Sequence, residues 1–167
     1  MPVKNPKELF VQMLSDLRQG SERSTKIWQE LSDAAQNPEI KEALEARSFV
    51  ADQNLAKIDQ VFKLIGEKPV KPNTRFYETF VEDFRRELAE IQLPVARQLF
   101  VLAKVSHLIH FRAGEYVALI AAADLTGNRA VGLLLETALA DKLAFIERTK
   151  RMLRNIVQTK IAERVAA

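Results

Sequence analysis

Apolar residues recur at every third or fourth position along most of this chain, which is the spacing of one face of an α-helix. No segment alternates apolar and polar residues in the manner of a half-buried strand. Together with the positions of Pro, Gly and Asn, the pattern predicts an all-α protein with helices over 6–35, 38–65, 76–91, 94–126 and 129–164.

The stretch 94–126 is the most apolar of the five, and it contains both histidines. Its apolar residues cover most of the circumference of a helix, including Val101, Leu102, Val105, Leu108, Ile109, Phe111, Tyr116 and Leu119. A helix that is apolar on nearly all sides is surrounded by neighbours in a folded protein. We therefore predict that this helix lies in the core.

The stretch 6–35 has a different character, because small hydroxyl residues interrupt its apolar stripe at Ser21 and Ser24. Gly20 stands directly before Ser21, and a glycine inside a helix costs about 1 kcal/mol relative to alanine. The glycine predicts either the close approach of a neighbouring element or a local bend.

The lengths of the connections predict the topology. Asn37-Pro38 and Gly127-Asn128 each mark a tight turn, so two long helical hairpins are expected. Residues 66–93 join the hairpins and include the short helix 76–91. Two hairpins with one long crossover form a four-helix bundle of ferritin-like topology, which we place in a single domain over 1–167.

Composition narrows the chemistry that is available. The chain has no cysteine, so carboxylates and two histidines are the only candidate metal ligands. A net charge of +3 is too small to indicate nucleic acid, which is not expected as a partner. Neither a signal peptide nor a run of about 18 apolar residues is recognisable, so we expect a cytoplasmic protein without a membrane partner.

Several segments resemble the YciF-like family of bacterial ferritin-like proteins. They are LSDLRQGSERS, NPEIKEALEA, IDQVFKLIGEKP and GEYVALIAAADLTGNRAVGLLLETALADK, which fall between about Glu8 and Met152. The resemblance implies a ferritin-like bundle that is usually dimeric, is associated with bacterial stress responses and has no assigned biochemical activity. It also implies that many members carry the carboxylate and histidine ligands of a di-iron site.

At most of the positions where the family has these ligands, this chain has a residue of another type. Ser21 stands where the family has a first glutamate, with Glu22 one residue on, and the next pair falls on Phe49 and Asp52. The remaining ligand positions fall on Ile109 or Arg112, on Asp141, and on Ala144 or Phe145. A guanidinium among the ligands would oppose a divalent cation, so we expect the di-iron site to be lost and no cofactor to be bound.

In place of the metal we predict an inner polar network of Ser21, Asp52, Arg112, Glu115 and Asp141. If the register differs from this alignment, a surviving site would use Asp52, Asp141, Glu22 and His110, and the protein would be a di-iron or manganese oxidoreductase. His107 and His110 are three residues apart and could share a metal, but histidines on an apolar helix are more often hydrogen-bonded packing residues.

The preferred functional interpretation is a non-enzymatic structural or interaction protein of a stress response, with an unidentified protein partner. Small residues at Gly114, Ala118, Ala121 and Ala122 extend beyond the inward stripe of 94–126. They predict a homodimer that forms through 94–126 and 129–164. The alternative is that the crossover helix covers this surface.

Overall fold

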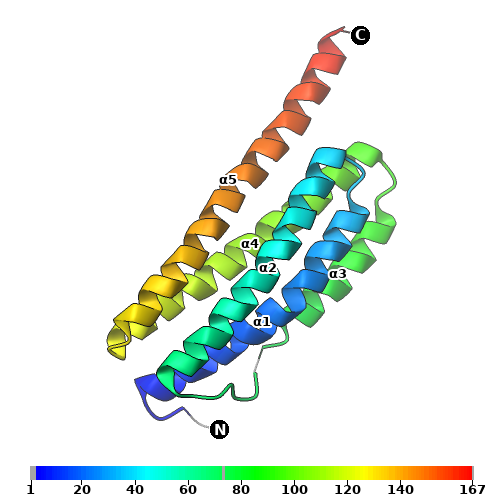
Figure 1. Ribbon diagram of the computed structural model, residues 1–167. Helices are drawn as coiled ribbons and strands as arrows, with labels where there is room; N and C mark the ends of the chain where they lie inside the picture. Colours follow the sequence, from blue (N-terminus) through cyan, green and yellow to red (C-terminus); the bar gives the residue numbers. More distant parts are fainter. Residues whose placement is uncertain (1–2, 73, 167) are drawn as a thin grey trace.

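A computed structural model describes residues 3–72 and 74–166, and helices account for most of them (Figure 1). The helices are α1 (Pro6–Ala34), α2 (Pro38–Ile65), α3 (Phe76–Glu90), α4 (Pro94–Leu125) and α5 (Arg129–Ala166). Their ends differ from the expected ends by at most two residues.

The Asn-Pro pairs begin the first two helices because the asparagine caps the helix and the proline fits its first turn. The Asn5 side chain accepts a hydrogen bond from the backbone N–H of Glu8 at 2.9 Å, and Asn37 accepts from the N–H groups of Glu39 and Ile40. Each following proline occupies the first turn, where no N–H donor is needed. Gly66 ends α2 in the left-handed conformation with φ 69°.

Figure 1 shows two antiparallel hairpins, α1 with α2 and α4 with α5, which lie against each other through α1 against α4 and α2 against α5. The crossover helix α3 lies on the outside of this arrangement and contacts α1 and α4. The architecture is therefore an all-α, ferritin-like four-helix bundle with a crossover helix, as predicted.

The buried core is divided along the length of the bundle into two apolar clusters. One cluster surrounds Trp28, Leu44 and Phe145, and the other surrounds Leu14 and Phe62. At the boundary between the two clusters each of the four long helices contributes a buried polar side chain: Ser21, Asn54, Arg112 and Lys142. The bundle thus contains a polar layer between two apolar halves.

Gly20 marks a close contact between α1 and α3. A Cβ atom at this position would overlap the ring of Tyr77, which is the buried residue of the first turn of α3. Of the two explanations that the sequence offered for this glycine, the structure therefore shows the close neighbour. The absence of a side chain at Gly20 lets Tyr77 reach the polar layer.

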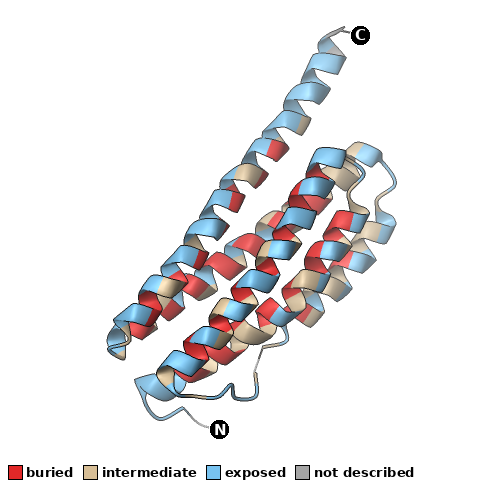
Figure 2. Cartoon of the chain, viewed as in Figure 1, coloured by how far each residue is buried: buried red, intermediate tan, exposed pale blue. Residues whose placement is uncertain are grey.

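The last turns of α5 extend beyond the other helices (Figures 1 and 2). They expose apolar side chains at Val157, Ile161 and Val165. None of the helices in residues 3–72 and 74–166 is long and apolar enough to cross a membrane.

Candidate functional site

Arg112 of α4 is the hub of the polar layer. One terminal nitrogen of its guanidinium, Nη1, donates to the Tyr77 hydroxyl at 2.6 Å, to Glu115 Oε2 at 2.7 Å and to the Leu17 carbonyl at 3.4 Å. The other, Nη2, donates to the Ser21 hydroxyl. This one side chain therefore joins α1, α3 and α4 in the interior.

Glu115 carries the negative charge of this network. It accepts hydrogen bonds from Arg112 and, at 2.9 Å, from the Tyr77 hydroxyl. Burial raises the pKa of the Glu115 carboxyl, and these two donors oppose the rise. Burial alone would lower the pKa of Arg112, but the nearby oxygens of Tyr77 and Glu115 reverse this and raise the pKa above its ordinary value. Arg112 and Glu115 thus form an ion pair in which the guanidinium is buried and the carboxylate is partly buried.

Arg47 of α2 is a second buried cation, and two aromatic rings lie beside it. Its guanidinium lies over the rings of Trp28 and Phe145, at 5.9 and 5.5 Å from their centroids. Its Nε atom is buried without a hydrogen-bond partner among the described residues. Burial, followed by the charge of Arg112, lowers the pKa of Arg47 to about 10. Cation–π contacts are therefore its main compensation.

Lys142 of α5 is the third buried basic side chain. Its Nζ atom donates to the Ala138 carbonyl at 3.1 Å and lies 3.8 Å from the centroid of the Tyr116 ring. Burial, followed by the charges of Arg112 and Arg47, lowers the pKa of Lys142 to about 6. At neutral pH most of the Lys142 population is consequently uncharged.

The three basic side chains meet at a small cavity, whose lining residues are Ser21, Ser24, Trp28, Arg47, Ala51, Asn54, Arg112 and Lys142. None of these described lining residues is an aspartate or a glutamate. Arg112, Arg47 and Lys142 are only 4%, 5% and 1% exposed. The centre of a water-sized sphere can occupy a volume of about 10 Å³ in this cavity. The cavity therefore has room for about one water molecule.

The residues at this position do not fit a di-iron or manganese centre. Such a centre needs several carboxylates or histidines around each dication, and here the inner positions hold two guanidinium groups and an amine. Within residues 3–72 and 74–166, no group of three or more His, Asp or Glu side chains is placed to hold a metal ion.

The structure brings together only part of the predicted network. Ser21, Arg112 and Glu115 lie in contact, whereas Asp52 and Asp141 are exposed on the surface. Asp52 accepts from the Thr25 hydroxyl at 2.6 Å. The prediction that Asp52 and Asp141 belong to the inner network is therefore wrong. Each aspartate stands one residue, or about 100° of helix rotation, away from a buried position.

The other residues of the alternative metal site also face outward. Glu22 is exposed and pairs with Arg18 at 3.4 Å, and His110 is exposed with Nδ1 2.8 Å from the Ser106 carbonyl oxygen. His107 is exposed as well, so the two histidines are surface residues and not the packing residues that were expected. The alternative set is therefore spread over the outer faces of the helices.

Sequence reasoning missed Arg47, Lys142 and Tyr77. The first two could have been found from periodicity. Arg47 belongs to the buried series Ile40, Leu44, Arg47, Ala51, Asn54 and Ile58, and Lys142 to the buried series Val131, Leu135, Ala138, Lys142, Phe145 and Thr149. A lysine or arginine that falls at a regular inward position of the apolar stripe indicates a buried cation. A solvated cation could stand at any position on the outer face of the helix.

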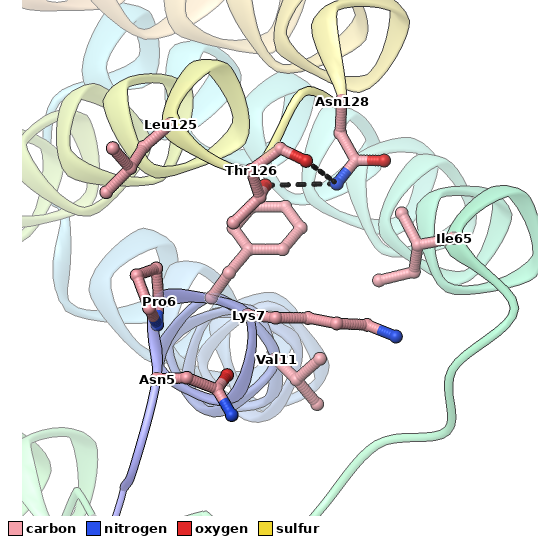
Figure 3. Close-up of a pocket in the computed structure, with 9 residues that line it drawn as sticks. Asn5, Pro6, Lys7, Val11, Ile65, Leu125, Thr126 and Asn128 are labelled. Carbon is pink, nitrogen blue, oxygen red and sulfur yellow. Dashed lines mark hydrogen bonds between the residues drawn. The ribbon is translucent and has the colours of Figure 1, made fainter.

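A second hollow, of about 610 Å³, lies where α1 begins, beside the turn between α4 and α5 (Figure 3). Its polar groups are engaged at helix ends: Asn128 Nδ2 donates to Thr126 Oγ1 at 3.0 Å, and Lys7 pairs with Glu67 at 2.5 Å. None of its described lining residues is acidic or a histidine. The central cavity therefore remains the candidate site.

The ion pair predicts how stability responds to a loss of charge. Glu115→Gln should lower the free energy of unfolding by about 3 kcal/mol, because it leaves the Arg112 charge buried without a counter-charge. Asp52→Asn removes an exposed carboxylate and should change it by less than about 0.5 kcal/mol. Urea unfolding followed by circular dichroism measures both, and equal effects for the two variants would contradict the network.

A family model and a protein of known sequence both match nearly the whole chain. A family model described as "Domain of unknown function (DUF892)" matches residues 5–162. Protein YciF of Escherichia coli K12 is 23% identical over 158 residues, which cover 93% of this chain and 95% of that protein.

Solved structures give the same fold. The E. coli stress protein YciF superposes with a TM-score of 0.87 at 22% identity, over 93% of this chain and 99% of that one. YcfI of Rhodopseudomonas palustris superposes with a TM-score of 0.84 at 21% identity, over 89% and 94% of the two chains. The chain thus belongs to the DUF892 family and is a YciF-like protein.

Proposed function

We propose that this protein is a non-enzymatic, ferritin-like bundle of a bacterial stress response, which acts in the cytoplasm as a structural or interaction protein and has lost the di-iron centre. The observation that carries the proposal is the set of basic side chains, Arg47, Arg112 and Lys142, around the central cavity, of which the two arginines are charged at neutral pH. A unit positive charge about 5 Å from a divalent cation opposes it by several kcal/mol even at an effective dielectric constant of about 20.

The size of the central cavity also argues against catalysis at the centre of the bundle. A substrate pocket typically has a volume of hundreds of Å³ and leaves its polar groups accessible. The central cavity holds about one water molecule, and its polar groups are buried. No organic substrate could reach Arg112 or Lys142 without separation of the helices.

The assignment to a stress response and to a structural role comes from relatives. E. coli YciF is described as a stress protein, and the R. palustris protein is described provisionally as a structural protein. At 21% to 23% identity, these descriptions support the proposal by association with a shared fold.

The loss of the metal centre is tested by metal content. Protein purified without chelator and incubated with ferrous or manganous ions, then freed of excess metal, should hold well below one metal per chain by mass spectrometry of the elements. About two irons per chain, lost in an Asp52→Ala, Asp141→Ala double variant, would contradict the proposal and favour a metal-dependent oxidoreductase.

We further propose that the protein forms a homodimer through the outward faces of α4 and α5. On α4, the residues His107, His110, Gly114, Ala118, Ala121 and Leu125 are all exposed, and none of these six is an aspartate, glutamate, lysine or arginine. On α5, Leu133 and Leu143 are also exposed. The face on α4 runs for about 27 Å, and an uncharged face can meet its own copy without like-charge repulsion.

Two features of α4 support a second copy as the occupant of this face. The crossover helix packs on another side of α4, where Phe76 stacks on Phe111 at 3.7 Å between ring centroids, so it leaves this face open. A Cβ atom added at Gly114 would meet nothing within 4 Å, so the packing of one chain gives no reason for this glycine. Close approach of a second helix would give one.

A charge placed in this face should separate the subunits. Ala121→Arg is expected to convert a species of twice the 18.9 kDa chain mass into a monomer, as measured by light scattering after gel filtration. Ala56→Arg, on the exposed side of α2, is the matched control and should leave the dimer intact. A monomeric parent protein, or a dimer that withstands Ala121→Arg, would contradict this interface.

A further inference from the structure

The charges around the central cavity do not balance. Arg112 is neutralised by Glu115, which lies outside the cavity lining. Arg47 and Lys142 have no carboxylate within salt-bridge distance among the described residues, although both line the cavity and both are buried. A buried charge without a partner is strongly unfavourable. The layer is therefore left with the positive charge of Arg47, and with that of Lys142 when it is protonated, which the described protein groups do not offset.

The cavity also has unused hydrogen-bonding capacity. Arg47 Nε is a buried donor with no partner among the described residues, and Asn54 Oδ1 is a buried acceptor with none. The Asn54 amide also has an NH2 group, and a half-turn of the amide exchanges the positions of this donor and the unpartnered oxygen. Arginine Nε–H, lysine ammonium and amide N–H groups together form a set of donors suited to a negative ion.

We propose that this cavity binds one small monovalent anion of the size of chloride, held by Arg47, Lys142, Arg112 and the Asn54 amide. The inference goes beyond the proposed structural role, because it assigns a ligand to the centre of the bundle. The volume limits the ligand to one water-sized particle, so phosphate, sulfate and organic acids are too large. The ferritin-like bundle thus has an anion where metal-binding members of the fold have cations.

Anion binding should be linked to the protonation of Lys142, whose pKa is lowered to about 6 in the empty cavity. The charged groups around it are Arg47 from α2, Arg112 and Glu115 from α4, and Asp141 beside it on α5. From α1, the cavity receives only serines and a tryptophan. An anion favours the ammonium form, so affinity should rise as the pH falls through the lowered pKa of Lys142.

The first test is thermal unfolding at constant ionic strength, with sodium chloride exchanged for sodium gluconate, whose anion is too large for the cavity. Above the dissociation constant, Tm should rise by about 3 to 5 °C for each tenfold increase in chloride. The rise should begin at a lower chloride concentration at pH 5.5 than at pH 8.

Variants locate the effect in the cavity. Arg47→Met should weaken the chloride dependence at both pH values, and Lys142→Met should remove its dependence on pH. Arg151→Met and Lys41→Met, at exposed positions of α5 and α2, are the matched controls and should behave as the parent protein.

A direct measurement keeps the proposal testable if a cavity variant fails to fold. Crystals of the unmodified protein grown in sodium bromide should show an anomalous bromide peak between Arg47 and Lys142. Equal Tm values in chloride and gluconate, or a bromide-free cavity that holds only water, would overturn the proposal.

Discussion

A positively charged guanidinium in the middle of the bundle is the constraint on which the rest of the structure depends. Arg112 is buried and bonded to groups on three helices: Ser21 and the Leu17 carbonyl on α1, Tyr77 on α3, and Glu115 on α4 itself. Breaking such a buried pair is strongly destabilising. The position of α3 follows from this, because Tyr77 reaches Arg112 only where Gly20 leaves space for its ring.

The same fold can therefore hold either negatively or positively charged side chains at its centre. In metal-binding bundles of this topology, carboxylates project inward from four helices and neutralise two dications. Here the four helices project inward a serine, an asparagine, an arginine and a lysine at the boundary between two apolar clusters, with a second arginine beside them. The backbone arrangement is kept, while the sign of the central charge is reversed. This explains why the fold alone does not predict the chemistry of its centre.

The helices and their topology could be predicted from the sequence because the signals are local. Spacing of apolar residues defines each helix, and Asn-Pro and Gly-Asn pairs define the turns. The close neighbour of Gly20 was one of two expectations, but its identity as Tyr77 depends on a contact 57 positions away in the chain, which periodicity does not encode.

The candidate site was predicted in part. Ser21, Arg112 and Glu115 are joined by hydrogen bonds in the structure, because all three lie near the inward-facing side of their helices. Asp52 and Asp141 were placed inward by the family's ligand positions, although one further step along the helix brings each carboxylate to the surface. Arg47 and Lys142 were overlooked because long cationic side chains usually reach solvent, whereas here their charged ends remain in the core.

The central claim, that basic side chains in the interior of this bundle lack carboxylate partners, is tested most directly at Lys142. Selective ¹³C labelling of lysine and an NMR titration in chloride-free buffer, with Lys142→Met to assign the signal, would give its pKa. The structure predicts a value of about 6, far below that of an ordinary lysine. A pKa of about 10 or higher would mean that an unrecognised negative group neutralises the layer, and it would contradict this description of the bundle centre.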